Sequence, residues 1–282
     1  MAVLCAEIGI EPAQAEDAVL VIRNGATEQR FTTSQLLSRP DVIALAGTGD
    51  IYRHRVVYRA LPLSAILGDR RDSRSDTVEA TARDGFASEI PFELVARATS
   101  GGSVAYIAVE DPAHPWPSLP NKTETAGPFY LIWDHPERSG ITREQSPYQL
   151  SSLSFTESPV HRWTQLALPV NIPIDAAARH GLDVFVTQCL PCHRLNGGGG
   201  SDTGPDLGRP MNPTQYLTDA GLRAIIRNPK GVRTWPGQQM IGFSTQILPD
   251  ADLDALVAYL RTMLASTAGC PDRANDSSCT GK

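Results

Sequence analysis

The pentapeptide Cys189-Leu190-Pro191-Cys192-His193 constrains this 282-residue chain more than any other stretch. Two cysteines separated by two residues suit a structural zinc site or a redox-active dithiol. A zinc site needs four ligands, but no histidine follows His193, and the only later cysteines are not spaced as in a zinc knuckle. A thioredoxin-type dithiol opens a helix after a strand, whereas this motif closes a predicted helix. Both interpretations therefore remain minor alternatives.

The histidine next to the second cysteine favours a third interpretation, covalent attachment of haem. Two thioether bonds can hold the edge of the macrocycle while the neighbouring imidazole reaches the iron. Cys189 and Cys192 are therefore the candidates for covalent attachment, and His193 is the candidate for one axial ligand.

The sequence around the motif predicts two helices that pack closely. Residues 175–188 read as one helix, with Leu182, Phe185 and Val186 on one face and Gly181 beside them. A glycine in a helix costs about 1 kcal/mol relative to alanine, so we expect Gly181 to permit close approach of a partner helix. That partner is predicted at 248–264, where apolar residues follow helical spacing: Leu253, Leu256, Val257, Leu260 and Leu264.

A methionine is the natural candidate for the sixth iron ligand, because its soft sulfur stabilises ferrous iron. Met240 stands 47 residues after His193, just before the last predicted helix. The intervening chain contains one predicted helix at 218–228, with Thr218 as its N-cap. Met211 is the alternative ligand, and Met263 is expected to fill the core.

Residues ~175–266 resemble a class I c-type cytochrome. The matching features are Gly181 with Phe185, the CLPCH motif, Gly204-Pro205-Asp206-Leu207, Met240 with Phe243, and a last helix containing Tyr259. The resemblance implies an all-α domain that carries one covalent haem c, with His193 and Met240 as axial ligands.

The same resemblance implies roles for residues near the haem. The carbonyl of Pro205 would accept a hydrogen bond from His193 and fix the orientation of the imidazole. Trp235, with Arg233, stands where it could contact the haem propionates, and an ordinary surface position is the alternative for both residues. The family often has Met-Pro-x-Phe, and this chain has Ile241 in place of the proline, which puts the geometry of the loop around Met240 in doubt.

The first half of the chain predicts a different architecture. Runs of β-branched and aromatic residues, punctuated by Gly, Pro and Asp, predict strands at 19–25, 54–59, 76–82, 104–110, 129–134 and 148–155, and the helical stretches between them are short. The expected fold class is therefore α+β, with a strand-rich domain at 18–165, a linker at 166–174 and the cytochrome domain at 175–268. Residues 1–17 are read as the remnant of an export signal, and 269–282 as a C-terminal tail.

Residues 18–157 resemble the sulfite-oxidase-type molybdopterin-binding fold. The features that carry this resemblance are Tyr58-Arg59-x-x-Pro62-Leu63, the Asp84-Gly85-Phe86 turn, and the strand GPFYLIW. That family binds molybdenum through a cysteine thiolate, and this chain has no cysteine between Cys5 and Cys189. We therefore expect the fold without its molybdenum centre, and no bound molybdopterin.

The placement of charges and cysteines indicates which partners and which cell compartment suit the protein. The net charge of −6 arises within residues 1–165, which hold 15 basic and 21 acidic residues, and it argues against nucleic acid as a partner. No apolar run approaches the ~18 residues of a membrane span. Cys270 and Cys279 are expected to form a disulfide, and Ala13-Gln14-Ala15 has the form of a signal-peptidase site. These features predict a periplasmic or otherwise exported protein.

The leading functional hypothesis is an exported monohaem cytochrome that carries single electrons, either as an electron-transfer protein or as the electron-transfer subunit of an oxidoreductase, and the question whether it is itself an enzyme stays open. Its partners would be a dehydrogenase or an oxidase, docked by the first domain, with the haem edge at Cys189 and Cys192 as the electron port. Two alternatives are a molybdenum-dependent oxidoreductase with a built-in haem and a haem-based ligand sensor.

Overall fold

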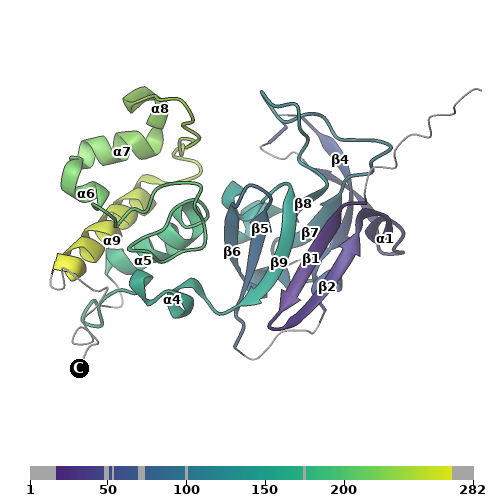
Figure 1. The fold of residues 1–282 in the computed structure, drawn as a ribbon, viewed down its shortest axis with the longest axis horizontal. Helices are drawn as coiled ribbons and strands as arrows, with labels where there is room; N and C mark the ends of the chain where they lie inside the picture. The colour runs from purple at the N-terminus through teal and green to yellow at the C-terminus, as the bar shows by residue number, and fades with distance from the viewer. Residues whose placement is uncertain are drawn as a thin grey trace, which may run out of the picture.

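A computed structural model describes residues 17–47, 51–52, 54–68, 74–98, 101–173 and 176–268 of the chain. Strands occupy the region up to Thr156, and helices dominate from Pro159 onward (Figure 1). The structure therefore has the strand-rich and helical halves that the sequence predicts. Cys5, Cys270, Cys279 and almost all of the expected export-signal remnant lie outside the described residues.

The larger sheet of the N-terminal region has five strands in the order β2-β1-β9-β5-β6. β1 pairs in parallel with β9, with Val21 opposite Ser152, while the other neighbours are antiparallel. The five strands are β1 (Val19–Asn24), β2 (Thr27–Thr32), β5 (Thr77–Ala82), β6 (Ala87–Pro91) and β9 (Leu150–Thr156).

The second sheet has four antiparallel strands in the order β3-β4-β7-β8. They are β3 (Ile43–Gly47), β4 (Val56–Pro62), β7 (Val104–Val109) and β8 (Phe129–Asp134). Apolar side chains of both sheets form one core, which three short helices complete: α1 (Thr33–Leu37), α2 (Leu63–Leu67) and α3 (Phe92–Val95). On its other face the four-stranded sheet carries an aromatic cluster, in which Tyr58 contacts Trp116 and Tyr130 edge to face.

The sequence did not predict three of the described strands, β2, β3 and β6. Each is an edge strand of its sheet. β2 and β3 are largely exposed, so their side chains do not alternate between core and solvent, and the sequence pattern is weak. β6 is buried up to Ile90, because the helical region covers its free edge.

Several short elements lie where the two regions meet. The turns η1 (Pro136–Ser139) and η2 (Arg143–Gln145) precede β9, and α4 (Pro159–Arg162) and η3 (Thr164–Leu166) follow it. Leu166 belongs to the apolar core of the helical region, although it precedes the first long helix. The division of the chain at 165 and 175 stays a prediction.

The helical region is built around two helices, α5 (Ala177–Val184) and α9 (Asp250–Ala268). Gly181 lies at their crossing, where an added Cβ would stand 1.9 Å from the carbonyl oxygen of Ala255. The expected close approach at Gly181 is thus confirmed. The remaining elements are η4 (Phe185–Cys189), α6 (Pro213–Tyr216), α7 (Asp219–Arg227) and α8 (Pro229–Val232). The Thr218 side chain caps α7, as predicted.

The described helices include none that combines the length and the apolar character needed to cross a membrane.

Candidate haem site

The CLPCH motif begins where α5 changes its geometry. η4 is a π-helical turn, closed by a hydrogen bond from the Leu190 N–H to the Phe185 carbonyl (2.9 Å). The His193 N–H then donates to the carbonyl of Cys189 (2.8 Å), so the first cysteine and the histidine lie on adjacent turns. Such π-helical turns are often found at functional sites.

The His193 ring is held in one orientation. Its Nδ1 lies 2.8 Å from the carbonyl oxygen of Pro205. A carbonyl can only accept, so the proton is on Nδ1 and the lone pair of Nε2 stays available to a metal. Gly204 makes room for the ring, because a Cβ there would lie 2.5 Å from His193 Cε1. The hydrogen bond implied by the family resemblance is therefore present, while its role toward haem stays a prediction.

The two cysteines are half-buried free thiols. Burial raises the pKa of Cys189 to about 12 and that of Cys192 to about 11, so both are protonated at neutral pH. A redox-active dithiol needs a lowered pKa to provide a thiolate, and the dithiol alternative is correspondingly weakened. Zinc is also disfavoured, because the described residues contain no group of three or more His, Cys, Asp or Glu side chains able to hold a metal ion. Two free thiols beside an imidazole with an available Nε2 fit covalent haem attachment.

The three methionines that follow the CLPCH motif in the sequence have different environments. Met240 is half-buried and packs against the core of the helical region, whereas Met211 is 47% exposed. Met263 is buried in the same core, as expected for a residue that fills space. These environments favour Met240 over Met211 as a ligand that faces the interior.

Trp235 lies on the irregular segment between α8 and α9. Its side chain is 49% exposed, and the guanidinium carbon of Arg233 lies 5.7 Å from the ring centre. The pair is therefore accessible to an anionic group, and its contact with haem propionates stays a prediction.

Residues 178–264 match the family model of cytochrome c. This part of the chain is a cytochrome c domain. A search of curated proteins found no match to the chain. The resemblance of residues 18–157 to the sulfite-oxidase-type fold remains a hypothesis.

The N-terminal region packs against the CLPCH loop of the cytochrome c domain. Pro191, between the two cysteines, is buried, and its carbonyl accepts a hydrogen bond from the Ala87 N–H of β6 (3.3 Å). Gln188 donates through Nε2 to the hydroxyl of Thr142, beside η2 (3.1 Å). We expected the cysteine edge to serve as the electron port; this packing covers part of that edge, and its use as a port stays a prediction.

A buried ionic cluster also joins the two regions. Arg162 of α4 donates through Nη1 to Glu79 on β5 (2.8 Å) and through Nη2 to Glu89 on β6, while its guanidinium carbon lies 4.0 Å from the Trp163 ring centre. Burial raises the pKa of Glu89 to about 8, although Arg162 opposes the shift; the charge of Glu79 adds to it. The Glu89 carboxyl therefore holds its proton to a higher pH than an ordinary glutamate.

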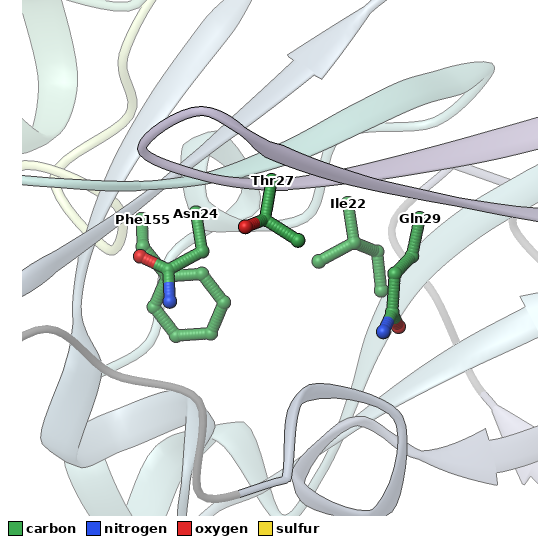
Figure 2. A pocket seen from close by; sticks show the side chains of 5 residues that line it. All are labelled: Ile22, Asn24, Thr27, Gln29 and Phe155. Carbon is green, nitrogen blue, oxygen red and sulfur yellow. The ribbon is translucent and has the colours of Figure 1, made fainter.

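Two hollows lie outside the CLPCH motif itself. Figure 2 shows side chains of β1, β2 and β9 around a cavity of about 260 Å³, lined by Ile22, Asn24, Thr27, Gln29 and Phe155. None of these side chains titrates near neutral pH, so the lining offers no general acid or base. A cleft of about 550 Å³ lies between residues 136–142 on one side and α5, η4 and the start of α9 on the other, and His180 Nε2 lies 2.7 Å from Asp252 Oδ1 in it.

Prediction from sequence missed the residues of the N-terminal region that contact the haem-attachment and Met240 segments, above all Ala87, Thr142 and Arg143. They belong to a different region of the chain, and no local pattern marks them.

Proposed function

We propose that this protein is a monohaem c-type cytochrome that carries single electrons between redox partners. In this proposal Cys189 and Cys192 hold the haem covalently, and His193 and Met240 are the axial ligands. The observation that carries the proposal is the pairing of two free thiols with an imidazole whose Nδ1 is fixed on Pro205, leaving Nε2 available. Haem c, when bound, supplies a one-electron couple between ferric and ferrous iron.

The protein orients the His193 ring and keeps water away from the motif. Pro205 fixes the tautomer and the rotation of His193, and Gly204 leaves room for the ring. Burial lowers the pKa of His193 and so favours the neutral imidazole that a metal requires, although the Pro205 hydrogen bond opposes this. Leu190 and Leu195, both almost fully buried, exclude water around the motif.

For the N-terminal region we propose a sulfite-oxidase-type fold without molybdopterin, used to dock a dehydrogenase or an oxidase. Its acidic character supports a basic partner surface. We further propose that the protein is exported, since C-x-x-C-H and the expected disulfide both suit an oxidising compartment.

The test of the proposal is haem content and ligation in the full chain. A pyridine haemochrome spectrum should show haem c in a one-to-one ratio to protein, and His193→Ala should abolish normal ligation. Met240→Ala should remove the long-wavelength absorption band of methionine-ligated ferric haem, while the matched variant Met211→Ala retains it. A preparation without covalent haem, or loss of the band only in Met211→Ala, would contradict the proposal.

Three further measurements address the alternatives. Stoichiometric molybdenum would favour the oxidoreductase, and tight binding of carbon monoxide to the native ferrous protein, as at an open sixth position, would favour the sensor. Fractionation of the source cells would test the export.

A further inference from the structure

The segment that carries Met240 has no regular structure of its own. Residues 233–247 lie between α8 and α9, outside any described helix or strand. Ile241, where the family often has proline, leaves the backbone after Met240 without the fixed φ of a proline ring. Contacts from elsewhere must therefore determine where Met240 lies. The inference below rests on the proposed function, in which Met240 is an axial ligand.

One set of contacts comes from within the cytochrome c domain, at the end of α7. The Phe243 N–H donates to the carbonyl of Ile226 (3.0 Å), and Arg227 donates through Nη1 to the carbonyl of Phe243 (3.0 Å). A Cβ on Gly242 would lie 2.2 Å from the Arg227 carbonyl oxygen, so the backbone is in close contact there. The segment is thus held against α7 from Gly242 onward.

The second set of contacts comes from the N-terminal region. Arg143, the first residue of η2, donates through Nη2 to the carbonyl of Gly242 (3.2 Å), and its guanidinium carbon lies 5.1 Å from the centre of the Phe243 ring. Two consecutive carbonyls, those of Gly242 and Phe243, are therefore held by arginines from different regions. Arg143 binds the carbonyl nearer to Met240.

Arg143 is itself held firmly. Its Nε donates to Glu144 Oε1 (2.7 Å), and the side chain of Glu144 is only 7% exposed. Thr142 and Gln145 form a capping box that fixes η2. Thr142 also accepts the hydrogen bond from Gln188, which precedes Cys189. One turn of the N-terminal region thus contacts both the haem-attachment segment and the segment that follows Met240.

We propose that Arg143 is a positioning residue for Met240, and that the N-terminal region in this way takes over the restraint that a proline at position 241 provides elsewhere. The guanidinium fixes the Gly242 carbonyl and covers the Phe243 ring. These contacts limit the motion of Met240 and Ile241, the two residues that precede Gly242. The strength of the methionine ligation then depends on the contact between the two regions. A cytochrome c domain released from the N-terminal region would bind its sixth ligand more weakly.

The test compares variants of the full haem-containing protein. Arg143→Ala should increase the affinity of the ferrous protein for carbon monoxide about tenfold or more, because a hydrogen bond from a charged donor no longer restrains the segment. It should also weaken the methionine absorption band and accelerate hydrogen exchange of the Phe243 amide. Arg143→Lys keeps a positive charge beside the buried Glu144 but lacks the planar fork, so it should fold normally and give an intermediate effect. Arg138→Ala, an exposed arginine of η1, is the matched control and should change none of these readouts.

Rescue gives the sharpest comparison. Ile241→Pro added to Arg143→Ala should lower the carbon monoxide affinity toward that of the unmodified protein, which a general loss of stability would not allow. Unchanged carbon monoxide affinity and Phe243 exchange in both Arg143 variants would overturn the inference. Failure of the proposed function is distinguishable, because Met240→Ala would then leave the absorption band intact, while Phe243 exchange still reports whether Arg143 holds the segment.

Discussion

The crossing of α5 and α9 gives the most quantitative prediction. In Gly181→Ala the new Cβ would lie 1.9 Å from the Ala255 carbonyl oxygen and 2.7 Å from Tyr259 Cβ. Ordinary contact begins near 3.4 Å, so the helices would have to separate by about 1.5 Å at the first of these contacts. Both nearest atoms in Ala255 are backbone atoms of α9, which cannot move independently of the helix.

The expected cost follows from two opposing effects. Alanine gains about 1 kcal/mol over glycine in a helix, but overpacking a tight contact costs about 1–3 kcal/mol, and separating the helices also loses dispersion contacts. We expect a net destabilisation of about 2 kcal/mol, which lowers the melting temperature of a domain of this size by roughly 10 °C. Thermal unfolding followed by haem absorbance and by circular dichroism measures it.

Gly221 in α7 is the matched control. A Cβ there would have Thr218 Oγ1 at 3.2 Å and otherwise only the Leu217 side chain, with Cδ2 at 3.8 Å. Gly221→Ala should therefore leave stability unchanged or raise it by up to about 1 kcal/mol. The same substitution is thus expected to act with opposite signs at the two positions. Equal changes in stability at the two positions, or no loss of stability in Gly181→Ala, would refute the close approach of α5 and α9.

Two further predictions concern buried polar groups. In the folded protein Glu89 keeps its proton up to pH about 8, whereas an unfolded chain releases it near the ordinary value of 4.5. The folded state therefore binds one more proton between these values, so its unfolding free energy falls as pH rises from about 4.5 to about 8, by up to about 1.4 kcal/mol per pH unit. Glu89→Gln should flatten this slope in urea titrations across the interval, and an unchanged slope would exclude Glu89 as its source. Tyr259→Phe should destabilise the helical region by about 1–3 kcal/mol in thermal unfolding, because the buried Tyr259 hydroxyl donates to the Leu166 carbonyl (2.8 Å); wild-type stability would argue that this bond contributes little.

Local patterns in the sequence were sufficient for much of the fold. β1 and β8 coincide closely with runs of β-branched and aromatic residues, and α7 begins directly after the predicted cap Thr218. The edge strands β2 and β3 were not predictable in this way, because pairing on one side and exposure leave no alternating pattern. The burial of β6 depends on the helical region and appears only in three dimensions.

The residues of the candidate haem site also divide into those that a local sequence pattern predicts and those that it does not. The CLPCH motif and the Gly204-Pro205 turn are local, and the hydrogen bond from His193 to Pro205 spans only 12 residues. Arg143 and Gly242 are separated by 99 residues and belong to different regions. An arginine in a polar turn has no sequence signature that connects it with a distant carbonyl, so only the packing of the two regions identifies it.

The position of Leu166 bears on what folds as a unit. The cytochrome c family match begins at residue 178, yet Leu166 is completely buried in the core of the helices. The carbonyl of Leu166 also accepts a hydrogen bond from the Tyr259 hydroxyl. Val160 and Trp163 pack against the same core. A fragment that starts at residue 178 would expose this part of the core and leave Tyr259 without its acceptor. A cytochrome fragment that keeps this part of the core and this hydrogen bond must therefore include the chain from about Ser158 onward, and with it the segment that the sequence predicts as a linker.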